Sequence, residues 1–151
     1  MIRRPPRSTL SSSSAASDVY KRQDLAEAKD FYVSTLKCEI GRQSDTWVDL
    51  NFFGHQLVIH YSKNNAKQKT SFNEVDGHQV PASHFGVILS WETFSSLESH
   101  LRSMNINFYL DPYLRFEGQP GEQKTMFIKD PSDNFIEFKS FRHLYEIFKT
   151  Y

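Results

Sequence analysis

Two histidines and one glutamate, each on a predicted strand, have side chains of the types that hold metal ions. His60 lies in the segment HQLVIHYS, His84 opens HFGVILS, and Glu137 lies in the middle of NFIEFKS. Because side chains alternate along a strand, each strand has an apolar face and an opposite face that carries one of these residues. Two imidazoles and a carboxylate suit Zn, Fe(II), Mn or Ni and leave coordination positions open.

The same three residues also have a purely structural interpretation. A lone histidine on a strand is more often a hydrogen-bonded residue of the core or rim than a metal ligand. Glu137 has the stricter requirement, because burying an unpaired carboxylate is costly and the group then needs water, a cation or a proton. His55 has the opposite parity to a ligand and adjoins a turn. Strand parity alone leaves both interpretations open.

The elements that would position these residues follow from the spacing of apolar side chains. Helical spacing, with Asp24 as N-cap, predicts a helix over residues 24–40, and the same spacing predicts a second over 91–106. The predicted strands cover residues 46–62, in two parts around a Phe53-Gly54 turn, and then 84–90, 124–130 and 134–141. Residues 107–123 are predicted to be a short strand that runs into a loop rich in glycine and proline. Residues 63–80 are polar and are expected to form a loop, and residues 142–151 a short terminal helix.

The two halves of the chain repeat one order of elements. Each half has a helix followed by strands, and the last strand of each carries a polar residue. The second half also has a strand before its helix, and the first half lacks one where residues 1–23 end. A twofold βαβββ repeat whose first strand is missing or replaced explains both facts, and the expected fold class is α+β.

Residues 1–23 differ in composition from the remainder of the chain. The segment is rich in serine and arginine and has little apolar periodicity, which is typical of a disordered tail or of a transit peptide. Its run PPRSTLSSSSAASDVYKRQ more specifically resembles a translated sequencing adaptor. We therefore expect residues 1–23 to be non-native or disordered, and the natural chain to join at about Asp24.

Composition excludes several classes of function. Residues 1–23 carry five basic residues and one acidic residue, which leaves 13 basic and 17 acidic residues in the rest. This mildly acidic balance without a basic stripe argues against nucleic-acid binding. The single cysteine, Cys38, excludes an internal disulfide and a Cys-x-x-Cys metal site, and it fits the cytoplasm. No apolar run approaches the roughly 20 residues that a membrane span needs.

Several longer segments carry a family resemblance. The segments DLAEAKDFY, DTWVDLNFFGHQLVIH and VDGHQVPASHFGVIL, followed by PYLRFEGQPGEQKTMFIKDPSDNFIEFKSF, resemble the vicinal oxygen chelate superfamily. This superfamily includes glyoxalase I, bleomycin-resistance proteins and type I extradiol dioxygenases. The resemblance covers residues 24–143 and implies paired βαβββ modules that form a curved mixed sheet around one divalent metal ion, with Fe(II) expected first and Zn, Mn or Ni as alternatives.

The resemblance also implies a set of metal ligands. His84 matches the histidine that opens the second module, and Glu137 matches the carboxylate on its last strand. His60 lies on the last strand of the first module, where many members have a glutamate or a histidine. The fourth position, a histidine on the first strand, has no match here, because VYKRQ occupies its place.

Three further residues are candidates for catalysis within this resemblance. Arg115 is suited to bind a substrate carboxylate through its guanidinium fork, or else it is a solvated surface residue. Tyr113 either donates a proton or hydrogen bond, or packs. Glu122 either acts as a base or caps the loop rich in glycine and proline.

Two classes of function follow from the resemblance. The first is a metal-dependent dioxygenase or glyoxalase-like lyase or isomerase that acts on a small molecule with vicinal oxygens. The second is a metal-free binding protein of the bleomycin-resistance type. A homodimer is expected in either case. The expected organisation is an added segment, a first module, a linker, a second module and a tail, over residues 1–23, 24–62, 63–82, 83–143 and 144–151.

Overall fold

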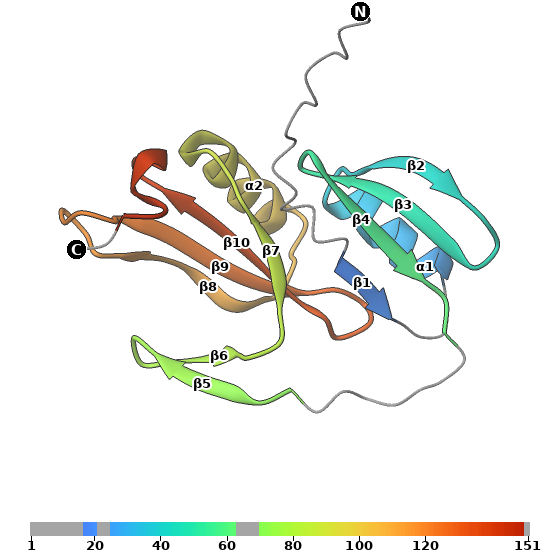
Figure 1. The fold of residues 1–151 in the computed structure, drawn as a ribbon, viewed down its shortest axis with the longest axis horizontal. Coiled ribbons are helices and arrows are strands. Elements are labelled where there is room, and N and C mark those ends of the chain that lie inside the picture. The colour runs from blue at the N-terminus through green and yellow to red at the C-terminus, as the bar shows by residue number, and fades with distance from the viewer. Residues whose placement is uncertain (1–16, 21–24, 63–69, 150–151) are drawn as a thin grey trace, which may run out of the picture.

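Two sheets of equal size organise the fold. The computed structural model describes residues 17–20, 25–62 and 70–149 of the 151-residue chain. These residues form two four-stranded sheets and one two-stranded sheet. Figure 1 shows the two larger sheets beside each other, with the small sheet on a separate arm.

The first sheet is built from the amino-terminal part of the chain, with strand order β1-β4-β3-β2. Strands β3 and β4 join at the predicted tight turn, where Phe53 and Gly54 both have positive φ and the Gly54 N–H donates to Asn51 Oδ1 at 2.8 Å. The elements are β1 (Ser17–Tyr20), α1 (Leu25–Asp30), η1 (Phe31–Thr35), β2 (Glu39–Gln43), β3 (Trp47–Phe52) and β4 (His55–His60).

The second sheet repeats this topology, with strand order β7-β10-β9-β8. In each sheet the first strand pairs in parallel with the last, and the other pairings are antiparallel. The paired βαβββ modules predicted from the sequence are therefore present. The elements are β7 (Phe85–Ile88), α2 (Trp91–Ser103), β8 (Phe108–Arg115), β9 (Gln123–Lys129), β10 (Phe135–Phe141) and η2 (Leu144–Glu146).

The first strand of the first module comes from the segment that was predicted to be foreign. Ser17–Tyr20 forms β1 and pairs with residues 57–60 of β4, so the position of the first strand is filled. This strand covers the edge of β4 that would otherwise be open. The prediction for residues 1–16 and 21–23 lies outside the described residues.

Two expectations about local structure were wrong. The first helix does not reach residue 40: it ends at Thr35, Lys37 takes a left-handed φ of 58°, and Cys38 N–H donates to Tyr32 O at 2.9 Å. A left-handed residue ends a helix, and β2 follows.

The second error lies in the expected loop. Part of it forms a hairpin, β5 (Phe72–Val75) and β6 (His78–Pro81). Asp76 and Gly77 join its strands with positive φ at both residues, which is the signature of a tight hairpin turn.

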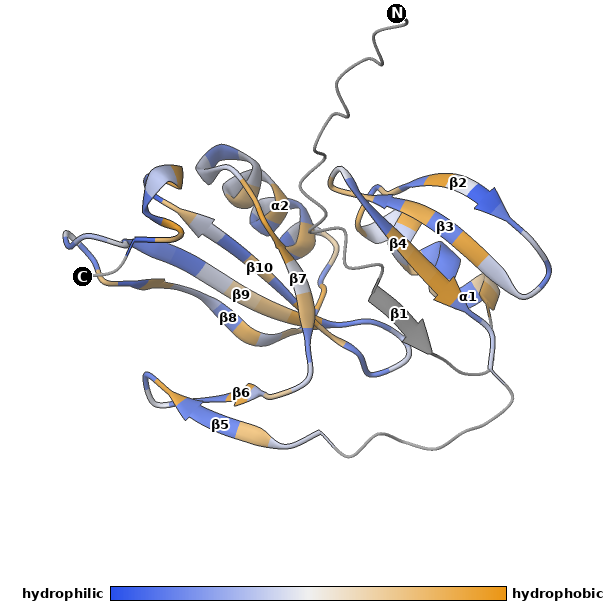
Figure 2. Ribbon diagram, viewed as in Figure 1, coloured by the Kyte–Doolittle hydropathy of each residue, from blue (hydrophilic) through white to orange (hydrophobic). Residues whose placement is uncertain are grey.

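The core runs through both modules. Ser90 caps the start of helix α2, because its hydroxyl accepts the Thr93 N–H at 3.1 Å, and the helix buries Phe94, Leu97 and Leu101. The turn between β3 and β4 inserts aromatic rings into the second module. There the ring centroids of Phe52 and Phe138 lie 6.0 Å apart. Figure 2 shows the hydrophobic residues concentrated on the strands and helices of the two larger sheets, and hydrophilic stretches on the β5–β6 hairpin.

Among the described residues, no helix is long and apolar enough to cross a bilayer.

Candidate functional site on the second sheet

One face of the second sheet gathers the polar side chains. Cross-strand pairing places Glu137 between Gly86 and Phe127, and it places Thr125 between Lys139 and Tyr113. The opposite face of β10 is apolar and fully buried at Ile136 and Phe138. We call the first surface the polar face, and its members are Tyr113, Arg115, Thr125, Glu137 and Lys139, together with His84 beside the first strand.

A glycine allows β7 to approach β10 at this point. A Cβ atom on Gly86 would collide with the backbone carbonyl of Glu137. The parallel pairing of β7 with β10 therefore requires glycine at residue 86, two residues after His84. This close approach brings the start of β7 against the centre of β10.

Glu137 has three polar partners, and they compensate for the burial of its carboxylate. Thr125 Oγ1 donates to Glu137 Oε1 at 2.8 Å, and Lys139 Nζ lies 3.1 Å from the same oxygen. His84 Nε2 lies 3.4 Å from the other oxygen, Oε2. Burial alone would raise the pKa of Glu137, but the hydrogen bond with His84 and the Lys139 ammonium outweigh burial and lower the pKa to about 2.

The orientation of the His84 ring follows from its other nitrogen. Nδ1 lies 2.8 Å from Pro81 O, and a carbonyl only accepts, so Nδ1 carries a hydrogen. In the neutral ring, Nε2 then presents a lone pair to a carboxylate, and this arrangement requires a cation between the two groups. A proton or a metal ion supplies it. The hydrogen bond with Glu137 raises the pKa of His84, as expected when that cation is a proton.

The donor types fit a divalent transition metal. Histidine ligands usually donate their second ring N–H to a carbonyl or carboxylate, as His84 does to Pro81. His84 and Glu137 are two candidate ligands from one module. Across the described ranges, no group of three or more His, Cys, Asp and Glu side chains is placed so that it could hold a metal ion.

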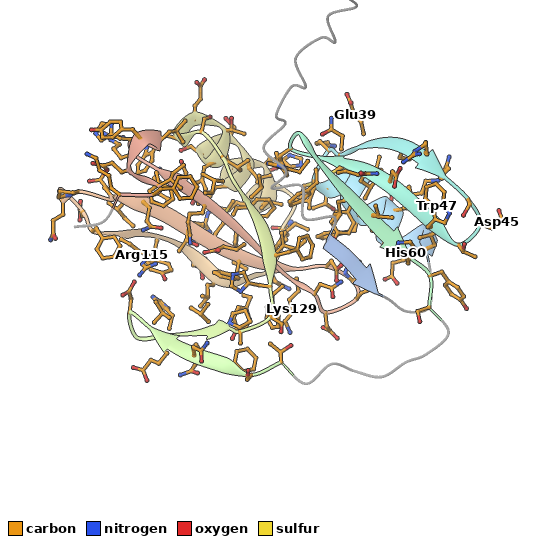
Figure 3. The ribbon with its side chains drawn as sticks, viewed as in Figure 1. Glu39, Asp45, Trp47, His60, Arg115 and Lys129 are labelled. Atoms are coloured by element: carbon orange, nitrogen blue, oxygen red, sulfur yellow. The ribbon has the colours of Figure 1, made fainter. Side chains whose placement is uncertain are left out.

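His60 lies on the other module. It ends β4, where it pairs with Trp47 of β3. Figure 3 shows His60 on the first sheet, far across the molecule from Arg115 at the end of β8. The structure therefore brings His84 and Glu137 together and does not bring His60 to them.

The β5–β6 hairpin covers the polar face along β8. Its His78 ring lies 4.4 Å from the Tyr113 ring, measured between centroids, and Tyr109 Oη donates to Gln79 O at 2.9 Å. At the base of the hairpin, Phe72 contacts Phe135, with ring centroids 5.9 Å apart. Figure 1 shows α2 and the hairpin on opposite sides of this sheet. The hairpin is therefore a wall of the site.

Two predicted catalytic residues lie at this wall. Burial raises the pKa of Tyr113, so its hydroxyl is a neutral hydrogen-bond donor near neutral pH. The Arg115 guanidinium is ion-paired with Asp76 of the hairpin and also lies over the Phe116 ring. Arg115 therefore holds the hairpin to the sheet as well as bordering the site.

The third predicted catalytic residue, Glu122, lies away from His84 and Glu137. It immediately precedes β9, whereas Glu137 pairs with Phe127, roughly 17 Å of strand further along. Its Oε2 accepts the Gly118 N–H at 2.7 Å, and its Oε1 lies 3.7 Å from Arg142 Nε. These contacts correspond to the loop-capping alternative.

Sequence reasoning passed over Lys139 and His78. Lys139 has the same parity as Glu137, so the alternation of side chains does place both residues on one face of β10. Only the register with β9 shows that Lys139 lies beside Thr125. His78 lies in the segment that was expected to form a loop. The dipeptide Asp76-Gly77 was the signal for that hairpin.

The fold is shared with several proteins of known structure. A glyoxalase/bleomycin resistance protein/dioxygenase from Alicyclobacillus acidocaldarius is 34% identical, with a TM-score of 0.68 over 87% of this chain and 92% of that chain. The fosfomycin resistance protein FosX from Listeria monocytogenes has a TM-score of 0.60 at 14% identity, over 86% of this chain and 94% of that chain. A lactoylglutathione lyase from Agrobacterium tumefaciens has a TM-score of 0.55 at 13% identity, over 82% and 89%.

The fold and the first of these similarities establish the family. The chain belongs to the glyoxalase/bleomycin resistance protein/dioxygenase family of the vicinal oxygen chelate superfamily. No family model matches the sequence, and no curated protein matches it. The two more distant structures show the fold alone.

Proposed function

We propose that this protein is a metal-dependent enzyme that acts on a small molecule with two neighbouring oxygen atoms. The observation that carries the proposal is the pairing of His84 Nε2 with Glu137 Oε2 at 3.4 Å, with Nδ1 already committed to Pro81 O. When bound, a divalent ion, Fe(II) before Zn, Mn or Ni, supplies Lewis-acid stabilisation of negative charge on the substrate oxygens. The reaction class is ring-cleaving dioxygenation or a glyoxalase-like lyase or isomerase reaction.

The residues of the polar face have defined roles in this proposal. His84 and Glu137 hold the ion, and Thr125 fixes the rotamer of the carboxylate through its hydrogen bond to Oε1. Tyr113 keeps its proton and donates a hydrogen bond to a substrate oxygen. The β5–β6 hairpin excludes water from the β8 side of the face, where Tyr113 lies.

A second copy of the chain completes the ligand set in this proposal. His84 and Glu137 supply two donors, whereas His60 lies on the first sheet of the same chain. We therefore place the first module of a second copy over the polar face, so that its His60 joins the ion. The active form is then a homodimer. The lone buried thiol of Cys38 supports a cytoplasmic location.

Metal stoichiometry tests the proposal. The variant Glu137→Ala is expected to abolish stoichiometric binding of Fe(II) or Zn²⁺ after purification without chelators, measured by elemental analysis. His55→Ala is the matched control, because His55 is an exposed histidine of β4 beside the turn. Metal retained by Glu137→Ala at the level of the unmodified protein would overturn the assignment of Glu137 as a ligand.

A second candidate function is a metal-free binding protein of the bleomycin-resistance type. The observation that favours it is Lys139, whose ammonium compensates the charge of Glu137 without any metal ion. This candidate predicts tight binding of a small molecule to protein stripped with a chelator, and unchanged affinity after metal is added. Turnover of a catechol in air that depends on Fe(II) would decide for the enzyme.

A further inference from the structure

Lys139 is a cation held at the centre of the polar face. Its Nζ lies 3.1 Å from Glu137 Oε1, and its side chain is 26% exposed. An ammonium has three hydrogen-bond donors, and among the described residues Glu137 is the one acceptor in contact with this group. Donors therefore remain for a ligand that enters from solvent.

The neighbours of Lys139 define the kind of ligand that fits. The cross-strand row places Lys139 beside Thr125, and Thr125 beside Tyr113. A positive charge and a neutral phenol thus line the same stretch of the face, on the side of Glu137 Oε1. His84 lies on the side of Oε2. The carboxylate of Glu137 separates a site for a cation from a site for an anion.

We propose that Lys139 binds an anionic group of the ligand and so makes the site selective for small carboxylates that also carry two neighbouring oxygens. This assignment rests on the proposed vicinal-oxygen site and specifies its substrate class. A divalent ion bound to Glu137 interacts with the carboxylate that otherwise compensates the charge of Lys139. The ammonium then needs a new anion, which a negatively charged ligand supplies and a neutral ligand does not.

Two probes that differ by one carboxylate test this selectivity. Catechol and 3,4-dihydroxybenzoate share the same pair of neighbouring hydroxyls, and the carboxylate of the second is too far around the ring to join them in chelation. Their affinities are measured by titration calorimetry with the full chain, both in Zn²⁺-loaded and in metal-free form. The variants are Lys139→Gln and, as a control with the same change of charge, Lys129→Gln on β9, which is 43% exposed.

The unmodified protein is expected to bind 3,4-dihydroxybenzoate at least tenfold more tightly than catechol. Lys139→Gln should remove most of that preference, Lys139→Arg should restore part of it, and Lys129→Gln should keep it. An unchanged preference in Lys139→Gln would overturn the assignment, as would equal affinities or no binding of either probe to the unmodified protein.

The same titrations separate this inference from the proposed metal site. If the unmodified protein fails to bind Zn²⁺ yet shows a preference in the metal-free form that Lys139→Gln loses, the metal proposal fails and the role of Lys139 stands. If Zn²⁺ binds stoichiometrically and the preference survives Lys139→Gln, the role of Lys139 fails and the metal proposal stands.

Discussion

The phenol of Tyr32 donates a hydrogen bond of 2.9 Å to the carboxylate of Asp130, and this bond joins the first module to the second. Tyr32 lies on η1, and Asp130 opens the turn between β9 and β10. The same carboxylate also organises its own turn, because Oδ1 accepts the N–H groups of Ser132 and Asn134, each at 2.9 Å. One buried acid therefore fixes both a turn and an interface between modules.

Removal of the Tyr32 hydroxyl is expected to destabilise the whole chain. In Tyr32→Phe the ring still fills the core, but Asp130 loses a buried hydrogen bond to a charged group, which costs about 1–3 kcal/mol in the free energy of unfolding. Urea denaturation followed by circular dichroism measures this loss. Tyr61→Phe, at an exposed position, is the control and should unfold like the original protein. An unchanged midpoint for Tyr32→Phe would show that the bond contributes nothing.

Removal of the Lys139 charge is expected to strengthen metal binding. The ammonium and a metal ion at Glu137 would both interact with one carboxylate and would repel each other. We expect Lys139→Gln to bind Zn²⁺ at least tenfold more tightly, measured by competition with a chromophoric chelator. Lys129→Gln should leave the affinity unchanged. Weaker binding by Lys139→Gln would mean that Lys139 supports the metal-bound form instead of competing with the ion.

The ion pair between Arg115 and Asp76 is expected to control the hairpin rather than global stability. Part of the pair is open to solvent, and such pairs contribute about 0–1 kcal/mol. In Asp76→Asn, backbone amides of residues 72–81 should exchange with deuterium several times faster, while the urea midpoint stays within error. Glu74→Gln, at an exposed position of β5, provides the control. Equal rates of deuterium exchange in both variants would indicate that the aromatic contacts, and not the ion pair, hold the hairpin to the sheet.

The sequence predicted the repeat because the spacing of apolar residues within each short segment indicates its helices and strands. The Phe53-Gly54 turn, the α2 helix and the parity of Glu137 on β10 depend on neighbouring residues, so pattern alone located them. The first helix was predicted to be too long because Lys37, the left-handed residue that interrupts it, does not alter the pattern of polar and apolar residues. The hairpin was missed because its strands carry few buried residues, and alternation is weak where both faces are exposed.

The candidate site was predictable only in part for a different reason. The position of His84 against Glu137 follows from the pairing of β7 with β10, which the family resemblance implies. The separation of His60 from them depends on how the two modules pack, through contacts such as that between Phe52 and Phe138. The partnership of Lys139 with Glu137 depends on rotamers. No local pattern in a single sequence encodes either of these.

The buried thiol of Cys38 is expected to make stability fall in alkali. Burial raises the pKa of Cys38 to about 11, from an ordinary value near 9. Between these two values the unfolded chain has lost the thiol proton and the folded chain still holds it. The unfolded state then binds fewer protons, so the free energy of unfolding decreases as pH rises, by about 3 kcal/mol across the window.

The variant Cys38→Ala removes this contribution, together with the small effect of the Cys38 thiolate on the pKa of Tyr32. The free energy of unfolding, measured in urea from pH 8 to pH 11, should fall more steeply in the original protein than in Cys38→Ala. Parallel slopes would mean that the folded thiol ionises near its ordinary pKa. Independently, a side chain that is 4% exposed should react with iodoacetamide at pH 8 far more slowly in the folded chain than in urea. Equal rates would show that the start of β2 opens readily, since Cys38 directly precedes that strand.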